Sequence, residues 1–178
     1  LILCKKAILV EGDSDELVVQ KAYRVYNNDH LPIQDQVDVI SVGTSFLRFL
    51  EIAVALNLKV AVVTDNDGDI DALEKKYAAY IKGNKRDNIT ICYDKIVDTG
   101  TLTIGGKPYN YNTLEPKLLK ANGNDLSLFN SILDTDFKSI EELQKYMKHN
   151  KTETALAVFD TDKQLLYPEY ILEAIKNE

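Results

Sequence analysis

The sequence lacks several features that mark whole classes of protein. It has only two cysteines, Cys4 and Cys92, and no C-x-x-C pair, so neither a disulfide framework nor a zinc site is indicated. No stretch approaches the roughly 20 consecutive apolar residues that a membrane span needs. The first residues also lack the layout of a signal peptide. These absences predict a soluble protein of the reducing cytoplasm without a membrane anchor.

Positive charge is scarce as well. The 21 Lys and Arg residues against 28 Asp and Glu give a formal net charge of −7. A protein that binds nucleic acid over its whole surface normally has a basic surface, and the negative net charge argues against such a protein. A cluster of carboxylates can still act on phosphates when it binds divalent cations, because the bound metal reverses the local sign of the charge.

The length of 178 residues and the hydrophobic content of 45% suit one well-buried core with a small helical appendage. The sequence begins at Leu1 rather than Met, and it contains no G-x-x-x-x-G-K-[ST] motif. We therefore expect a fragment of a longer protein whose partner domains lie outside it.

Strand and helix patterns alternate through the first half, which is typical of an α/β fold with a parallel sheet flanked by helices. After residue 95 the pattern changes to a hairpin around Gly105 and Gly106, followed by a series of helices. We predict a core at 1–98 and a C-terminal hairpin and helical extension at 99–178. The expected strands are 7–11, 37–42, 59–65 and 88–94, and the later helices lie near 115–121, 138–148, 152–159 and 168–176.

Acidic residues follow two of these buried strands. In "VEGDSDE", Glu11 ends the first strand and Asp15 lies one helical turn further on; in "VVTDNDGD", Asp65 and Asp67 follow the third strand. Ligands of open parallel sheets bind outside the carboxyl ends of the strands. If the first and third strands are neighbours, both acidic segments meet in one crevice.

Other acidic and basic residues have structural interpretations. Asp13 and Glu16 fit a D-x-x-E capping box for the following helix. Glu115 can simply favour a helix N-terminus just inside Thr113. Lys151 can be one more solvated lysine of the "KYMKHNK" stretch.

Three alternative sites explain the pattern less well. An EF-hand fails because Ile70 stands where glycine is needed and Lys76 where a bidentate glutamate is needed. A haloacid-dehalogenase-type phosphatase, with Asp65 as nucleophile, leaves the first acidic segment without a role. A receiver-like module matches Asp65, but its expected Lys-Pro occurs here only as Lys107-Pro108, inside the predicted hairpin.

A strand ending in E-G followed by a strand ending in D-x-D resembles the Toprim domain of topoisomerases, primases and several nucleases. "VEGDSDELVV" with "VVTDNDGD" looks most like the Toprim region of the overcoming-lysogenization-defect (OLD) family nucleases, which include the Gabija-type anti-phage nuclease. "NTLEPKLL" is similar to the T-x-E helix start of that family, and "NKTETALAV" resembles its K-x-x-x-A segment. The resemblance runs from about residue 7 to residue 158.

The resemblance implies a set of site residues. Two Mg²⁺ or Mn²⁺ ions would be bound by carboxylates of both halves of the chain, Glu11, Asp15, Asp65, Asp67 and Glu115. Lys151 would contact the scissile phosphate or the developing charge, with Glu11, Asp65 and Asp67 as the other catalytic residues. Asp15 stands where many relatives have Glu, so its side chain reaches less far.

The resemblance also implies a function and partners. It predicts a divalent-metal-dependent DNA endonuclease domain that hydrolyses phosphodiesters with two metal ions. Relatives carry an ATPase domain on the N-terminal side, and we expect homo-oligomers to form through that domain. The alternatives are a non-hydrolytic metal-binding regulatory or receiver-like module and the Toprim domain of a topoisomerase or primase.

Overall fold

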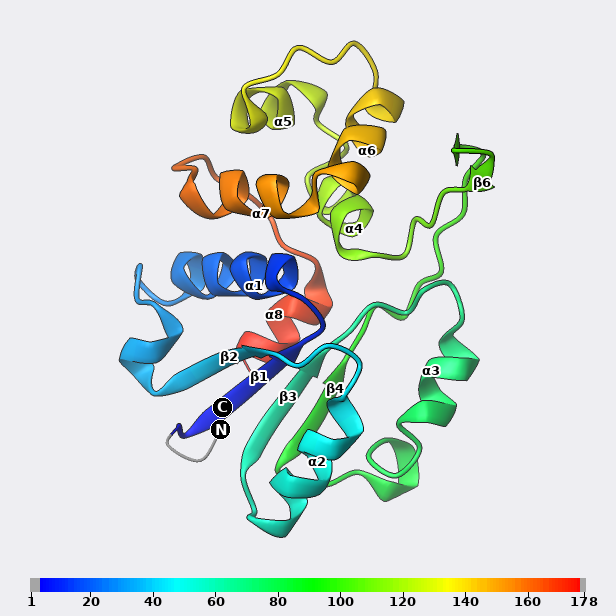
Figure 1. Cartoon of the computed structure of the whole chain (residues 1–178). Coiled ribbons are helices and arrows are strands. Elements are labelled where there is room, and N and C mark those ends of the chain that lie inside the picture. Colours follow the sequence, from blue (N-terminus) through cyan, green and yellow to red (C-terminus); the bar gives the residue numbers. More distant parts are fainter. Residues whose placement is uncertain (1–3, 177–178) are drawn as a thin grey trace.

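A computed structural model describes residues 4–176 and contains one four-stranded parallel sheet (Figure 1). The strand order is β2-β1-β3-β4, so β1 and β3 are neighbours, with Ile8 opposite Ala61. All four predicted strands are confirmed, and their bounds are β1 (Lys6–Val10), β2 (Val37–Ser41), β3 (Lys59–Val63) and β4 (Ile89–Cys92). The condition for two converging acidic segments is therefore met.

Helices cover both faces of this sheet. On one face lie α1 (Asp13–Tyr26) and α8 (Glu169–Lys176), and on the other lie α2 (Phe46–Ala55) and α3 (Ile70–Lys76) (Figure 1). Successive side chains of a strand point to opposite faces. Accordingly, Ile8 and Val10 belong to the hydrophobic cluster that contains α1, while Leu9 belongs to the cluster that contains α2. This double coverage explains why β1 and β3 are apolar on both faces.

The second half of the chain adds a hairpin and a helical layer. The small sheet pairs β5 (Thr103–Ile104) with β6 (Lys107–Pro108), as predicted around the two glycines. In Figure 1, α7 lies along α1 and the chain then returns to the sheet as α8. The division of the chain into a core at 1–98 and a C-terminal extension at 99–178 stays a prediction. The helices are α4 (Leu114–Ala121), α5 (Leu126–Leu133), α6 (Ile140–His149) and α7 (Lys151–Asp160), and short 3-10 helices occur at η1 (Pro32–Asp35) and η2 (Lys82–Asn84).

The sequence did not lead us to predict helix α5. The Asp125 side chain caps α5 by accepting a hydrogen bond from the Leu128 backbone N–H at 2.9 Å, and Phe129 is fully buried. An Asp before an apolar stretch is a typical helix start, so the information was present in the sequence. Within residues 4–176, no helix has both the length and the apolar character that crossing a membrane requires.

Candidate active site

A cavity of about 390 Å³ lies at the carboxyl ends of β1 and β3. Glu11 directly follows β1, and Asp65 lies just beyond the end of β3. The helices α4 and α7 contribute from the second half of the chain. The cavity is lined by all six predicted site residues, Glu11, Asp15, Asp65, Asp67, Glu115 and Lys151, together with Gly12, Asp13, Ser14, Thr113 and Thr152. The six predicted site residues, which are separated by up to 140 positions, thus line one space.

The start of α1 differs from the predicted capping box. The N-cap is Gly12 rather than Asp13, and Asp15 reaches back to accept a hydrogen bond from the Gly12 N–H at 3.0 Å. Glu16 instead accepts from Gln20 Nε2 at 3.1 Å. Because Gly12 has no side chain, only this half of a capping box exists. The interaction holds the Asp15 carboxylate at the cavity, whereas Asp13, which was assigned a capping role, lines the cavity beside it.

Glu115 and Lys151 form an ion pair between the N-terminal turns of α4 and α7. Their charged atoms are 3.2 Å apart, with the Glu115 side chain 5% exposed and that of Lys151 50% exposed. Although burial opposes the ammonium, the neighbouring Glu115 carboxylate raises the pKa of Lys151. Thr113 Oγ1 also donates to Glu115 Oε2 at 3.3 Å. Glu115 thus lies in the first turn of α4, as the helix-start interpretation expects, and Lys151 keeps a half-exposed side chain while it pairs with Glu115.

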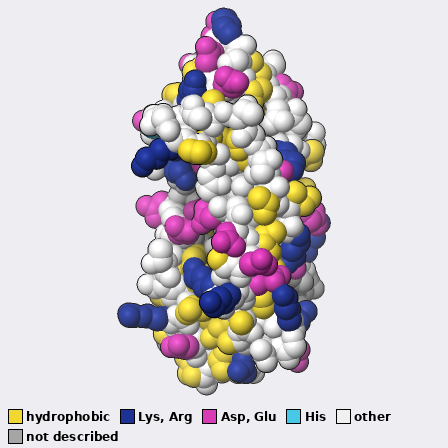
Figure 2. Space-filling model, turned by 90° about the vertical axis from the view of Figure 1, so that its right-hand side faces the viewer, with side chains coloured by type: hydrophobic (Ala, Val, Ile, Leu, Met, Phe, Trp, Pro, Cys, Tyr) yellow, Lys and Arg dark blue, Asp and Glu magenta, His cyan; other side chains and the backbone are white. Residues whose placement is uncertain are grey.

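The carboxylates of the cavity repel one another. Burial, followed by the charges of Asp15, Glu115 and Asp67, raises the pKa of Asp65 well above its usual range. Burial is also the main reason that the pKa of Asp15 rises to about 6. Six of the lining residues are acidic and only Lys151 is basic. The face in Figure 2 carries a band of Asp and Glu side chains across its middle, so a phosphate approaching this acidic cavity needs additional positive charge.

The Asp67 loop has a special backbone conformation. Asp67 and Gly68 have φ values of 50° and 85°, in the left-handed region that few side chains tolerate. The Asn110 Nδ2 group donates to Asp67 Oδ1 at 3.2 Å and so joins the site from a distant segment. Sequence reasoning missed Asn110 because 43 positions separate the two residues. Ser14 and Thr152 were also missed, although each directly neighbours a predicted site residue.

The donor set fits a hard divalent cation in its chemistry. Mg²⁺ and Mn²⁺ prefer carboxylate and water oxygens, and mutual repulsion among clustered carboxylates favours the entry of a cation. Within residues 4–176, no three Asp, Glu, His or Cys side chains converge closely enough to hold an ion in their present orientations. Each of three candidate ligands has a partner inside the protein: Asp15 the Gly12 N–H, Asp67 the Asn110 amide, and Glu115 the Lys151 ammonium. Ion binding therefore requires some of these side chains to turn.

A larger cavity of about 580 Å³ lies behind α4 and has a different character. Four tyrosines, among them Tyr167 and Tyr170, contribute to its walls, together with Lys117. None of the six predicted site residues lines it. The smaller cavity is therefore the one in which the candidate ligands meet.

The repulsion around Asp65 makes a stability prediction for the metal-free protein. In EDTA at neutral pH, Asp65→Asn is expected to raise the melting temperature by roughly 2–4 °C, the shift that about 1 kcal/mol produces in a domain of this size. The reason is that a neutral amide of the same shape removes the cost of burying a charge and the repulsion from the neighbouring carboxylates. Thermal unfolding measured by circular dichroism checks the shift.

The matched control is Asp69→Asn. Asp69 is an N-cap that accepts from the Ala72 N–H at 2.9 Å, and it does not line the cavity. Asn caps helices about as well as Asp, so the control should leave the melting temperature nearly unchanged. A decrease for Asp65→Asn would contradict the uncompensated-charge account of the cavity.

Comparison with known proteins shows which family and which solved structures the chain resembles. Residues 2–67 match the family model described as Overcoming lysogenization defect protein-like, TOPRIM domain. The solved C-terminal region of the Burkholderia pseudomallei OLD protein is similar over 98% of this chain and 96% of that chain, with 18% sequence identity and a TM-score of 0.66. The C-terminal region of the Xanthomonas campestris pv. campestris OLD protein, phased with mercury, is similar over 99% of this chain and 95% of that chain, with 17% sequence identity and a TM-score of 0.60.

These findings confirm the resemblance and the fold class that the motifs predicted. The family model spans both acidic segments through Asp67, while the structural likeness extends over the T-x-E and K-x-x-x-A segments. No curated protein matches the chain.

Proposed function

We propose that this OLD-like Toprim domain is the catalytic domain of a divalent-metal-dependent DNA endonuclease that hydrolyses phosphodiesters with two metal ions. The observation that carries the proposal is the convergence of six acidic residues, the five candidate ligands among them, and one lysine in a single cavity at the carboxyl edge of the sheet. A site for a neutral ligand has no need of so many acids. A Toprim domain of the OLD type provides independent support for a nuclease-type function.

The ligand assignment follows the position of each side chain. Glu11, Asp65 and Asp67 come from the ends of β1 and β3 and would hold the cations from the side of the sheet. Asp15 and Glu115 face the same space from the first turns of α1 and α4. When bound, the cations would stabilise negative charge on the phosphate oxygens and lower the pKa of a water molecule.

Lys151 carries the only basic side chain among the residues that line the cavity. Its half-exposed ammonium lies at the N-terminal end of α7, where a phosphate can reach it. In the free protein it neutralises Glu115. We assign it the stabilisation of charge that develops on the scissile phosphate, because a preformed charge at that point acts most strongly where water is partly excluded.

The partners that the proposal requires are DNA and an ATPase domain on the N-terminal side, through which homo-oligomers form. The negative net charge of −7 means that this domain alone offers little electrostatic attraction for DNA. An additional domain that holds DNA, or bound cations, would offset this. The carboxylates would then contact the substrate only through the metal ions.

Plasmid cleavage tests the proposed function. Supercoiled plasmid should be nicked or linearised with Mg²⁺ or Mn²⁺, tested alongside Ca²⁺, and EDTA should stop the reaction. Asp65→Asn should lose nearly all activity, since it removes a central ligand, while Asp69→Asn outside the cavity should keep it. Agarose gel electrophoresis of the plasmid forms measures the result.

Two outcomes would overturn the proposal in different ways. Cleavage that persists in Asp65→Asn would come from another site or a contaminating nuclease. Cation binding by the wild type without any cleavage, also in a protein that includes the ATPase domain, would favour the non-hydrolytic regulatory module.

A further inference from the structure

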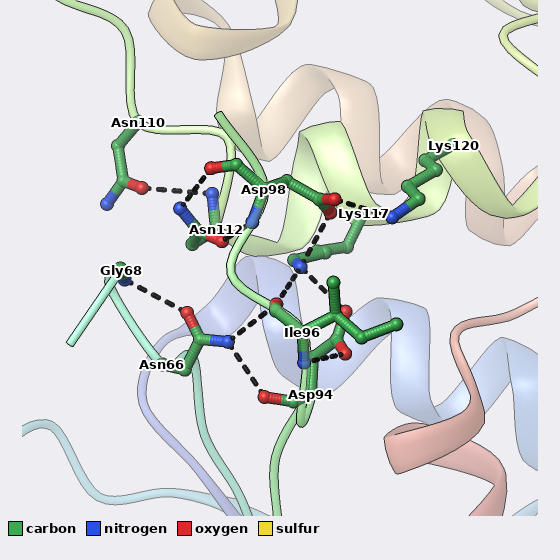
Figure 3. Close-up of polar contacts among 9 residues, drawn as sticks. All are labelled: Asn66, Gly68, Asp94, Ile96, Asp98, Asn110, Asn112, Lys117 and Lys120. Atoms are coloured by element: carbon green, nitrogen blue, oxygen red, sulfur yellow. Dashed lines mark hydrogen bonds and ion pairs between the residues drawn. The ribbon is translucent and has the colours of Figure 1, made fainter. Parts of the chain in front are cut away.

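A polar network with two buried side chains joins the Asp65–Asp67 loop to helix α4. We call it the Asn66–Lys117 network, and its members besides these two residues are Asp94, Ile96 and Asp98 (Figure 3). Asn66 and Lys117 lie at its two ends, and the segment 94–98, which follows β4, lies between them. Neither residue lines the candidate active site.

Asn66 fixes the acidic loop in two ways. Its Nδ2 group donates to the carbonyl oxygens of Asp94 at 2.7 Å and Ile96 at 3.1 Å, and its Oδ1 accepts from the Gly68 N–H at 2.9 Å. The second bond closes a turn around Asp67, whose left-handed backbone needs such support. The Asn66 residue is only 2% exposed although carboxylates flank it on both sides. One amide thus holds the turn and anchors it to 94–98.

Lys117 fixes the other end. Its Nζ lies 2.6 Å from Asp94 Oδ2 and 2.7 Å from Asp98 Oδ2, and it donates to the Ile96 carbonyl at 2.8 Å. The side chain is 3% exposed, so all three donor positions of the ammonium are used inside the protein. Because Lys117 lies two residues after Glu115 in α4, this contact fixes the start of the helix against the same segment.

A second route links the same two places. Asn110 donates to Asp67, and its Oδ1 accepts from the Asn112 N–H at 2.9 Å. Asn112 accepts from the Asp98 N–H at 2.7 Å and donates to the Asp98 carbonyl at 2.9 Å. Figure 3 shows Asn112 beside Asp98, between the acidic loop and α4. The loop and the helix start are therefore connected through two sets of hydrogen bonds that meet at Asp98.

We propose that Asn66 and Lys117 are positioning residues that fix the backbone of the Asp65–Asp67 loop relative to the start of α4, so that the side chains of Asp65, Asp67 and Glu115 can turn toward one divalent cation. The inference rests on the proposed function, because it concerns the same cation site. Mg²⁺ demands ligand oxygens at about 2.0–2.1 Å in near-octahedral geometry, so small displacements matter. Repulsion pushes the carboxylates apart, and the network supplies the opposing restraint. Outer contacts of this kind typically change metal affinity by about tenfold to a hundredfold.

The test compares Mn²⁺ affinity with stability in four variants. Isothermal titration calorimetry gives the Mn²⁺ dissociation constant, and thermal unfolding in EDTA gives the stability. Asn66→Ala and Lys117→Met should each weaken Mn²⁺ binding by about tenfold or more. Lys120→Met is the matched control, since Lys120 pairs with the same Asp98 at 2.6 Å but has a 48% exposed side chain. It should change the dissociation constant less than twofold.

A fourth variant separates positioning from general loss of stability. Leu50→Ala truncates a fully buried side chain in the cluster on the α2 face of the sheet. It should lower the melting temperature in EDTA, yet leave Mn²⁺ affinity unchanged when binding is measured well below the transition. A purely structural role of the network predicts that Asn66→Ala behaves in the same way as Leu50→Ala.

The outcomes distinguish this inference from the proposed function. Wild-type Mn²⁺ affinity in folded Asn66→Ala and Lys117→Met would overturn the inference and leave the proposed function standing. If Lys117→Met does not fold because Asp94 and Asp98 lose their partner, Asn66→Ala decides the question alone. A wild type that does not bind Mn²⁺ would overturn both, the proposed function first.

Discussion

Replacing Lys151 with Ala is expected to slow DNA cleavage by on the order of a hundredfold or more, the usual cost of removing one preorganised charge from a reacting centre. Only interactions that are stronger in the transition state change the chemical step. The Mn²⁺-induced rise in melting temperature should persist in Lys151→Ala, because the variant frees the Glu115 carboxylate from its ion pair. Cleavage rates on supercoiled plasmid at saturating Mn²⁺ measure the effect.

Two further variants sharpen this experiment. Lys151→Arg should restore activity poorly, since a planar guanidinium does not place its charge where a compact ammonium does. Lys145→Ala removes an equal charge from an exposed position of α6 and does not touch the cavity, so it should cleave like the wild type. Full activity in Lys151→Ala would leave Lys151 only the role of neutralising Glu115.

The sheet was predictable because its strands are apolar runs, two of which are followed by acidic residues. Apolar runs such as "AILV" before Glu11 can be buried on both faces only within a covered parallel sheet, and their acidic ends mark the edge where ligands bind. The helix α5 is short and was overlooked, although Asp125 marks its start. Local sequence therefore determined the elements, and strand order then determined which ends meet.

Several features of the site depend on tertiary contacts that the local sequence pattern does not predict. The assignment of a cap to Asp13 was wrong because either of two neighbouring acids can satisfy a helix start, and the glycine N-cap selects Asp15. Nothing in its local sequence distinguishes Lys117, yet the fold buries it between Asp94 and Asp98. Asn110 reaches Asp67 because the segment after β6 (Lys107–Pro108) returns to the acidic loop. Such roles arise from tertiary structure rather than from residue spacing.

Saturating Mn²⁺ is expected to raise the melting temperature by roughly 5–10 °C, since a ligand at 100 times its dissociation constant contributes about 2.7 kcal/mol. The rise should grow with Mn²⁺ concentration, because the ion binds the folded state preferentially. Asp67→Asn should remove most of it. Asn suits this test better than Ala, because it tolerates the left-handed backbone at φ 50° and keeps an oxygen for the Asn110 amide.

Asp69→Asn is the control that separates a specific ligand from nonspecific attraction of Mn²⁺. Both changes remove one negative charge from the same loop, so a nonspecific attraction of Mn²⁺ to acidic surface would weaken equally in the two variants. Only Asp67 lines the cavity, and a true ligand set predicts that only its replacement abolishes the stabilisation. An equal response would mean that Asp67 is not a ligand, and the cation site would then have to be assigned to Glu11, Asp15, Asp65 and Glu115 alone.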